Sequence, residues 1–560
     1  MAVQYGTSKK NCLVVLLHGY ASKVSSYDSV KYQISKNYPN AEILIPRLGL
    51  HKFSNADPNK VVNSVIKLID KKYESHRYEE IVLIGHSSGA LLARKIYVYA
   101  CGENDDSPFE LFHFKKTRIW ASKVSRIVLM AGMNRGWTVN RHLSFVNSVF
   151  LKLGIAVGDI LSLFNYNMFI FKIRKGAPFI TQLRLQWLSM LNGVTFKKIG
   201  NAVVVQMLGS IDDLVSPDDN IDLITGNNFY YLEVPFSGHV TVRDMDDTYA
   251  GRKRAEVFAS ALLTNTTELE KLQIDSFEQQ PLMQRNDVTD VVFVIHGIRD
   301  AGFWTKKIGS RVQKLGSVSK RIFETETSSY GYFPMLSFLF YATRRAKVEW
   351  LMDQYTENKA RYPMAQFSFI GHSNGTYLLA RALEDYPACK FKHIVFAGSV
   401  VRQGYNWNRM IANRRIQGIL NLVASADLVV AIFPKAFQTL QIQDIGSGGH
   451  DGFSSLSSNC QLRYLKGSHG AGIKEELWDT IANYIVNGST AAFPANICIK
   501  KQNGFVKILG LLSPLILLAI IGLLGLVGYG IKIVLKDYLV LQTIFIGLYL
   551  IIIWKVITKL

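Results

Sequence analysis

The sequence has 560 residues, about three times the length of a typical domain, which leaves room for two large domains and an appendage. Hydrophobic residues make up 48% and charged residues 19%, which excludes disordered and collagen-like classes and provides apolar side chains for sizeable cores. The formal net charge of +21 predicts attraction to anionic partners, either a nucleic acid or an anionic membrane surface.

The basic residues are spread along the chain in small groups, and no zinc-finger, helix-turn-helix or aromatic RNA-binding motif accompanies them. We therefore expect an anionic membrane surface rather than a nucleic acid, with a solvated basic face as the alternative. The five cysteines are widely spaced and form no Cys-x-x-Cys pair, so we expect reduced thiols, with neither a disulfide framework nor a metal site.

Short apolar runs alternate with amphipathic stretches, which is typical of a mostly parallel sheet flanked by helices. The first run, Cys12–Leu17, is too short for a secretory signal and is predicted to be a buried strand. The other strands predicted in the first half are Glu42–Ile45, Glu80–Ile84, Ser125–Met130, Ala202–Leu208 and Tyr230–Val234. Those of the second half follow in the same relative order: Val291–Ile295, Gln366–Ile370, His393–Ala397, Ile419–Ala424 and Gln461–Leu465.

Three segments of the first half recur, in order, in the second half. The matching pairs are Val14–Gly19 with Val292–Gly297, Ile84–Gly89 with Ile370–Gly375, and Leu91–Arg94 with Leu378–Arg381. Agreement at three separated places predicts a duplicated domain rather than short solenoid repeats. We assign residues 1–263 to the first domain, 264–288 to a linker, 289–500 to the second domain and 501–560 to a membrane segment.

The two halves differ in one insertion. Roughly 80 residues separate Gly132 from Asp212, whereas roughly 30 separate Gly398 from Asp427. The extra stretch, about 138–198, is predicted to form an apolar helical cap over the site of the first domain. Its aromatic residues include Phe145, Phe150, Phe164, Phe169, Phe171 and Trp187.

The C-terminal segment is predicted to form a transmembrane helical hairpin, with a buried helical hairpin as the alternative. Ile508–Ile531 has no charged residue and can cross a hydrocarbon core of about 30 Å, whereas Tyr538–Trp554 is shorter and spans it only marginally. The flanking lysines give a slight positive-inside bias, and no secretory signal is recognised. Both domains are therefore expected to face the cytoplasm.

Gly85–Gly89 and Gly371–Gly375 both read Gly-His-Ser-x-Gly, each after an apolar run and before a helical pattern. This context is typical of a nucleophile elbow, a strained turn that exposes the serine at the N-terminus of a helix, where a developing oxyanion is stabilised. Ser87 and Ser373 are the predicted nucleophiles. On these motifs the chain resembles the α/β-hydrolase superfamily, particularly its lipase and esterase branches, over most of both halves but not over the hairpin.

The resemblance implies two tandem α/β-hydrolase domains, each with a Ser, Asp and His triad in that chain order. In the first copy it places the acid at Asp212, with Asp213 as an alternative, and the base at His239. In the second copy it places the acid at Asp427 and the base at His469, with His450 as a competing histidine.

The resemblance also implies an oxyanion hole of two backbone N–H groups in each copy. These belong to Tyr20 and Ser88 in the first copy, and to Ile298 and Asn374 in the second. The histidines that precede the oxyanion loops, His18 and His296, are expected to be structural. The implied chemistry needs no cofactor and no metal.

The sequence therefore predicts a membrane-anchored serine hydrolase that cleaves carboxylic esters, lipids above all, in the manner of a lipase or phospholipase. Two alternatives stay open: a protein deacylase or thioesterase, and a membrane-tethered scaffold without activity. The acyl chain, the headgroup and the oligomeric state are left open.

Overall fold

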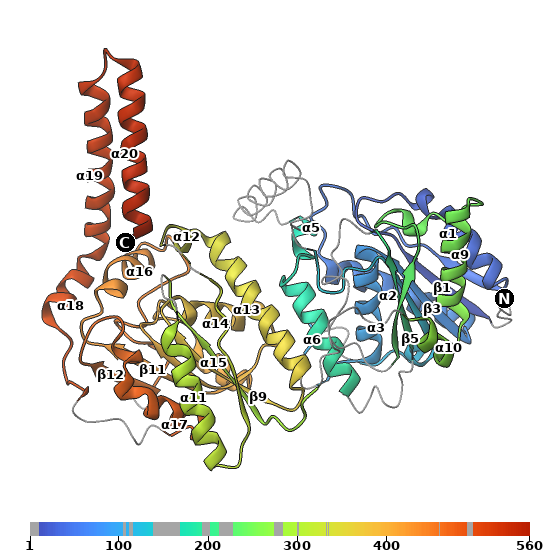
Figure 1. The fold of residues 1–560 in the computed structure, drawn as a ribbon, viewed down its shortest axis with the longest axis horizontal. Coiled ribbons are helices and arrows are strands. Elements are labelled where there is room, and N and C mark those ends of the chain that lie inside the picture. The colour runs from blue at the N-terminus through green and yellow to red at the C-terminus, as the bar shows by residue number, and fades with distance from the viewer. Residues whose placement is uncertain are drawn as a thin grey trace. The chain divides into compact units, whose positions relative to one another are not determined.

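The computed structural model describes residues 11–104, 108–110, 116–137, 168–192, 202–211, 228–273, 284–298, 302–331, 333, 335–457, 460–489 and 497–559. The chain divides into two compact units. The first comprises Met1–Met283, Met352–Arg361 and Tyr386–Ala388, and the second comprises Gln284–Leu351, Tyr362–Asp385 and Cys389–Leu560. Each unit contains a parallel sheet flanked by helices, which confirms the predicted pair of α/β domains (Figure 1).

Six strands form the first sheet: β1 (Cys12–Leu17), β2 (Ala41–Leu44), β3 (Glu80–His86), β4 (Val124–Met130), β5 (Val203–Gly209) and β6 (Phe229–Val234). Their order is β2-β1-β3-β4-β5-β6, and every neighbouring pair is parallel. Successive side chains of a strand point to opposite faces, so Leu13 and Val15 of β1 enter one core while Val14 and Leu16 enter the other. Because both faces of the central strands are covered, β1 is apolar and buried at every residue.

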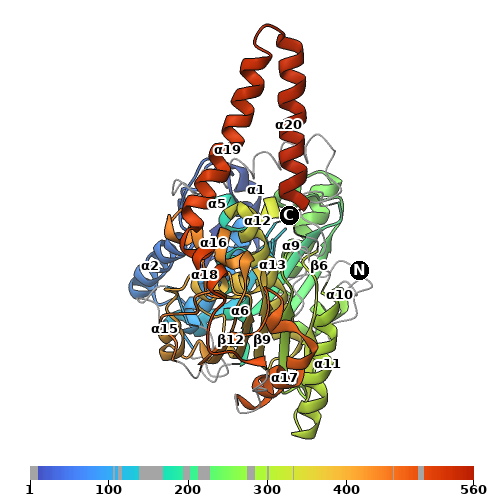
Figure 2. The same ribbon diagram turned by 90° about the vertical axis from the view of Figure 1, so that its left-hand side faces the viewer.

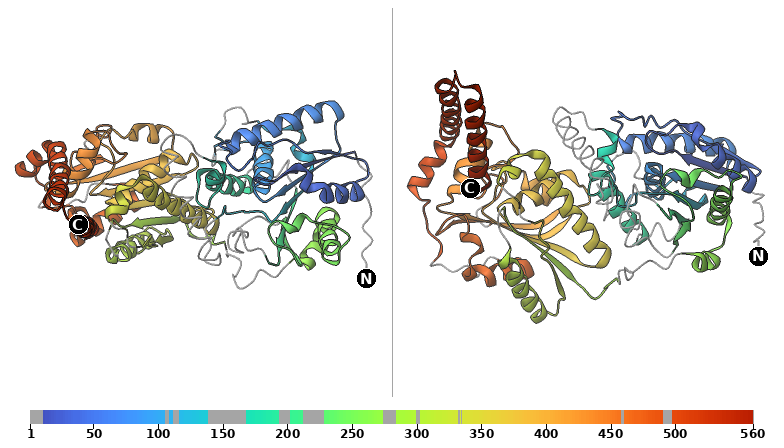
Figure 3. Two further views of the ribbon diagram at one scale, coloured as in Figure 1. Left: turned by 90° about the horizontal axis from the view of Figure 1, so that it is seen from above. Right: turned by 45° about the horizontal axis from the view of Figure 1, so that its top comes forward.

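Seven helices belong to the described part of the first unit: α1 (Asp28–Asn37), α2 (Pro58–His76), α3 (Ser88–Cys101), α5 (Phe169–Lys172), α6 (Pro178–Asn192), α9 (Tyr249–Leu263) and α10 (Thr266–Leu272). Helices α2, α3 and α6 bury their apolar sides in one core, and α1, α9 and α10 in the other, on the two sides of the sheet (Figure 3). The helix α10 lies within the stretch predicted as a linker.

The second sheet consists of β7 (Asp290–Ile295), β8 (Phe323–Glu326), β9 (Gln366–His372), β10 (Phe391–Ala397), β11 (Ile416–Ala424) and β12 (Gln461–Leu465). It is also parallel, in the order β12-β11-β10-β9-β7-β8. Read from β8, this order repeats that of the first sheet strand for strand. The strand β8 is absent from the sequence prediction because Phe-Glu-Thr-Glu has neither an apolar run nor a buried second face.

The second unit also contains α11 (Phe303–Val318), α12 (Met335–Leu339), α14 (Asn374–Asp385), α15 (Trp407–Ala412), α16 (Leu428–Thr439) and α17 (Trp478–Asn487). Helix α13 (Tyr341–Arg361) is divided between the units, since Met352–Arg361 belongs to the first. Helices α11 and α17 share one core with the sheet, which includes Val292 and Val294 of β7 together with Ile308 and Ile481. Helix α14 follows β9 and packs against it.

Three helices end the chain: α18 (Gly504–Leu511), α19 (Ser513–Val534) and α20 (Leu539–Lys559). The predicted span Ile508–Ile531 falls mostly on α19, but its first residues belong to α18, because the helix is interrupted at Leu512, two residues before Pro514, which lacks an N–H and restricts the residue before it. In the described part, α19 is the one helix long and apolar enough to cross a membrane, and the apolar part of α20 ends at Ile553. Figures 1 and 2 show α19 and α20 side by side, projecting from the second unit.

Candidate active site

Each predicted nucleophile lies in a strand–turn–helix connection. Ser87 separates β3 from α3, and Ser373 separates β9 from α14. Their backbone φ angles are +56° and +52°. Residues other than glycine rarely adopt positive φ angles, and those that do are often found at functional sites. Both serines therefore have the strained backbone that a nucleophile elbow requires.

The last glycine of each elbow allows the helix to approach the first strand of its sheet. A Cβ on Gly89 would lie 2.2 Å from the carbonyl oxygen of Leu17, and one on Gly375 would lie 2.6 Å from that of Ile295. No side chain fits at such distances. These close contacts explain why the motif has glycine after the serine in both copies.

The serines also lie at equivalent positions, at the carboxyl end of an inner strand of each sheet. In the first sheet β1 lies between β2 and β3, and in the second β7 lies between β8 and β9, so the strand order reverses direction at β1 and β7. In open parallel sheets, ligands bind at the carboxyl ends of the strands beside such a reversal. Ser87 and Ser373 follow β3 and β9 at this position.

The structure brings His239 to Ser87, although 152 residues separate them in the chain. The Nε2 of His239 lies 2.8 Å from the Oγ of Ser87, and the His239 side chain is largely buried. This geometry suits a general base that accepts the serine proton. Asp212 and Asp213 lie outside the described residues, so the acid of this site stays a prediction.

A buried hydrogen-bond chain supports the elbow and the base loop together. His86 donates from Nε2 to the carbonyl oxygen of His239 at 2.9 Å, because a carbonyl can only accept. Its Nδ1 then accepts from the Tyr27 hydroxyl at 2.8 Å, and the Tyr27 oxygen accepts the N–H of Gly19 at 2.9 Å. Tyr27 was missed by the sequence analysis, since no motif marks it. It connects the oxyanion loop to the nucleophile elbow.

The predicted oxyanion donor Tyr20 is already hydrogen-bonded. Its backbone N–H donates to the Oγ of Ser88 at 2.8 Å, and Ser88 is fully buried. Phe169 of α5 stacks on the Tyr20 ring, with centroids 5.9 Å apart, so one part of the predicted cap does lie beside the oxyanion loop. An oxyanion at Ser87 would have to displace the Ser88 hydroxyl to use the Tyr20 amide.

Another part of the predicted cap belongs to the core instead. Trp187 of α6 is buried against the Arg94 guanidinium and the rings of Tyr97 and Phe229. Helix α6 packs against α3, so this stretch completes a face of the sheet. Residues 138–167 and 193–198 of the insertion, including Phe145, Phe150 and Phe164, lie outside the described residues.

In the second unit the acid and base are paired. The Nδ1 of His469 lies 2.9 Å from the Oδ2 of Asp427, which is fully buried at the start of α16. The competing His450 lies elsewhere, where it contacts Gln502 through its ring nitrogens and Gly510 of α18. Burial lowers the pKa of His450, against an opposing effect of Asp451. The structure therefore pairs Asp427 with His469 and not with His450.

The link between base and serine differs between the two units. Among the described residues, no hydrogen bond joins Ser373 to His469, whose ring lies 4.8 Å from the ring of His372, centroid to centroid. The His372 Nε2 reaches the carbonyl oxygen of His469 at 3.4 Å, longer than its counterpart in the first unit. The rings of Trp304 and His372 lie perpendicular to each other, with centroids 6.1 Å apart, whereas His86 accepts a hydrogen bond from the Tyr27 hydroxyl.

The two oxyanion loops are each held by their histidine. The Nδ1 of His18 donates to the Gly19 carbonyl oxygen at 3.0 Å, and the Nδ1 of His296 donates to that of Gly297 at 2.8 Å. Neither contact engages a nucleophile. In the second unit, the Asn374 side chain donates to the Tyr330 hydroxyl at 3.2 Å, and Ile298 directly precedes residues 299–301, which are not described.

No family model matches this chain, and no curated protein matches it in sequence. Among solved structures it is similar to a lipase-esterase related protein from Clostridium acetobutylicum ATCC 824, at 13% identity over 45% of this chain and 96% of that one, with a TM-score of 0.27. It is also similar to the phospholipase PlaB from Legionella pneumophila, at 13% identity over 47% and 62% of the chains, with a TM-score of 0.31. At such identities and TM-scores these resemblances carry no argument about function.

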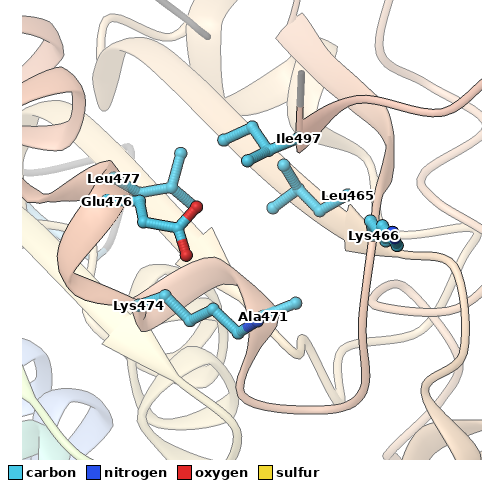
Figure 4. Close-up of a pocket in the computed structure, with 7 residues that line it drawn as sticks. All are labelled: Leu465, Lys466, Ala471, Lys474, Glu476, Leu477 and Ile497. Atoms are coloured by element: carbon cyan, nitrogen blue, oxygen red, sulfur yellow. The ribbon is translucent and has the colours of Figure 1, made fainter. Parts of the chain in front are cut away.

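A pocket beside the His469 loop is separate from the candidate site (Figure 4). None of the predicted site residues lines it; the residues that do are Leu465, Lys466, Ala471, Lys474, Glu476, Leu477 and Ile497. Within the described ranges, no group of three or more His, Cys, Asp or Glu side chains is placed to hold a metal ion.

Proposed function

We propose that this chain is a membrane-anchored serine hydrolase with two α/β-hydrolase domains, each cleaving carboxylic esters through a Ser, His and Asp triad. The observation that carries the proposal is the contact of 2.8 Å between Nε2 of His239 and Oγ of Ser87. A serine hydroxyl is a weak nucleophile unless a neighbouring base accepts its proton. The positive φ of Ser87 and the adjacent helix N-terminus complete the arrangement.

In the proposed reaction, His239 accepts the Ser87 proton as the oxygen attacks the ester carbonyl carbon. The tetrahedral oxyanion is stabilised by backbone N–H groups at the start of α3 and at Tyr20, once the Ser88 hydroxyl has moved aside. The imidazolium then protonates the leaving alcohol, and water, deprotonated by His239, hydrolyses the acyl-serine. We assign the acid that orients His239 to Asp212, with Asp213 as the alternative.

The second site is proposed to work in the same way with Ser373, His469 and Asp427. The buried Asp427 carboxylate at 2.9 Å fixes which ring nitrogen of His469 carries the proton, and it stabilises the imidazolium. Nε2 is thereby left as the acceptor for Ser373. The contact between Ser373 and His469 is proposed to form when substrate binds, as catalytic hydrogen bonds often tighten in the substrate complex.

Lipid esters are the proposed substrates because α19 is apolar and long enough to hold the chain in a bilayer. Tethering raises the local concentration of lipid at both sites, and the net charge of +21 favours an anionic leaflet. We propose that both domains face the cytoplasm. Protease added to sealed, right-side-out cells should leave both domains intact, and their digestion would reverse this orientation.

The activity can be tested with a fluorophosphonate probe on the full chain in detergent or vesicles. Wild-type protein should label at both Ser87 and Ser373, each single alanine variant at the remaining serine, and the double variant at neither. Peptide mapping identifies the labelled residue. Absence of labelling in folded wild-type protein would favour the scaffold alternative, and faster cleavage of acyl-cysteine peptides than of lipid esters would favour the deacylase alternative.

A further inference from the structure

Asp427, the proposed acid of the second site, lies at the N-terminus of a helix that contacts α18 and α19. Helix α16 begins directly after Asp427 and packs against both α18 and α19. Its first two residues, Leu428 and Val429, are apolar yet 42% and 45% exposed. Figure 1 shows α16 and α18 at the base of the α19–α20 pair.

Helix α18 also presents apolar side chains outward. Phe505, Ile508 and Leu511 follow a spacing of three residues and are 67%, 57% and 66% exposed. On its other side Val506 is buried, and Gly510 packs so closely that a Cβ there would lie 2.8 Å from Nε2 of His450. On a water-soluble surface the outward side of a helix is polar, whereas α18 has apolar residues on both its buried and its exposed side. Exposed apolar clusters of this kind mark contacts with a partner or a membrane.

The length of α19 sets the level of this cluster relative to a bilayer. Its 22 residues rise about 33 Å, which matches a hydrocarbon core of about 30 Å from Ser513 onward. Helix α18 ends two residues before Ser513, so a bilayer spanned by α19 would place the exposed side of α18 where the acyl chains meet the headgroups. Lys500, Lys501 and Lys507 are exposed nearby and can contact anionic headgroups.

We propose that Leu428, Val429, Phe505, Ile508 and Leu511 form a bilayer-docking surface, which seats the second unit with Asp427 at headgroup level. An acyl ester then reaches Ser373 from the bilayer rather than from the aqueous phase. The occupant of this surface is lipid, because the surface continues directly from α19 and carries lysines at its edge. The inference rests on the proposed membrane anchor and deepens the proposed function by specifying the route of the substrate.

Docking can be measured on the full chain with a polarity-sensitive dye on single introduced cysteines, after Cys460→Ser and Cys498→Ser remove the partly exposed thiols. The test variants are Val429→Cys and Ile508→Cys, the matched control is Val318→Cys, which is 78% exposed, and Ile521→Cys in α19 reports the anchor. The vesicles contain phosphatidylcholine with a minority of phosphatidylserine and a spin-labelled quencher lipid. We expect quenching at 429, 508 and 521 and none at 318.

Quenching at 521 without quenching at 429 and 508 would overturn the docking surface and leave the anchor standing. Absence of quenching at 521 would overturn the anchor itself, and with it the membrane part of the proposed function. A second measurement compares Ile508→Glu with Ile508→Leu in a Ser87→Ala background. The glutamate should lower hydrolysis of a vesicle-embedded long-chain ester about tenfold and leave a soluble short-chain ester unaffected, because a charge opposes insertion at the interface. Equal effects on both esters would contradict the proposed route.

Discussion

The Asp427 carboxylate holds His469 at 2.9 Å and also accepts the N–H of Val430 at 3.0 Å, so one side chain both orients the base and caps α16. These two roles can be separated, because asparagine caps a helix about as well as aspartate but carries no charge. The side chain therefore allows a test of catalysis that leaves the fold intact.

Asp427→Asn should retain the thermal stability of the protein while lowering fluorophosphonate labelling of Ser373 by about four orders of magnitude, since the asparagine favours the wrong tautomer of His469. Asp427→Ala should lose the labelling and, in addition, about 1 kcal/mol of stability from the missing cap. Labelling is measured in a Ser87→Ala background and stability by thermal unfolding. Labelling by Asp427→Asn at the wild-type rate would remove Asp427 from the site.

Tyr27→Phe should slow labelling of Ser87 about tenfold, because Nδ1 of His86 and the N–H of Gly19 lose a buried partner, at about 1–3 kcal/mol for an unsatisfied group. The measurement uses a Ser373→Ala background. The control is Tyr38→Phe, which removes another buried hydroxyl of the first unit, one that donates to the Leu262 carbonyl oxygen. An equal slowing in both variants would show a general loss of stability instead of a positioning role.

Ser88→Ala should speed labelling of Ser87 between about twofold and tenfold, because the Tyr20 N–H no longer has to give up a hydrogen bond of about 0.5–1.5 kcal/mol before it binds an oxyanion. Rates are compared with Ser88→Thr, which keeps the hydroxyl. A large decrease in the alanine variant would mean that the Ser88 hydroxyl itself stabilises the oxyanion.

Gly375→Ala should destabilise the second unit by more than about 2 kcal/mol, since the new methyl group would meet the Ile295 carbonyl oxygen at 2.6 Å. Gly404→Ala is the matched control, because no atom lies within 4 Å of a Cβ at that position. Chemical unfolding followed by fluorescence compares the two. A Gly375→Ala protein as stable as wild type would exclude the tight strand–helix contact.

Stability should fall as the pH drops below about 6.5, because the buried His450 has a lowered pKa and its imidazole takes up a proton more readily in the unfolded chain. Asp451, Lys435 and Asp427 are the charged groups that act on it. Urea unfolding of wild type and His450→Gln at neutral and mildly acidic pH measures the difference. The variant should lose less stability than wild type on acidification, and an identical loss would rule out His450 as a contributor.

Sequence patterns predicted all strands of the described sheets except β8, because most of the others are apolar runs, as in β1 and β7, which are buried at every residue. The strand β8 lies at a sheet edge, and its residues after Phe323 are only partly buried, so it leaves no apolar signal. The break at Leu512 was missed for a different reason. Hydropathy alone does not register the loss of a hydrogen bond at Pro514.

Only those site residues that belong to a local sequence motif could be predicted from the sequence. The elbows are visible in the sequence because their glycines and strained serines are local requirements. His469 and His450 both follow glycine-rich segments, so only the folded chain shows which one contacts Asp427. Tyr27 could not be predicted at all, since its role depends on Gly19 and His86 meeting around it in space.

The strands of each sheet are contiguous in the chain: the first sheet ends at Val234 and the second begins at Asp290. At a synthesis rate of about 5–20 residues per second, the ribosome needs roughly 3–11 s to proceed from the end of the first sheet at Val234 to the start of the second at Asp290. The first sheet can therefore close before its near-duplicate strands, such as Val292–Gly297 beside Val14–Gly19, are made. Vectorial synthesis thus protects the chain from pairing a strand of one sheet with the wrong sheet, a hazard that refolding from denaturant restores.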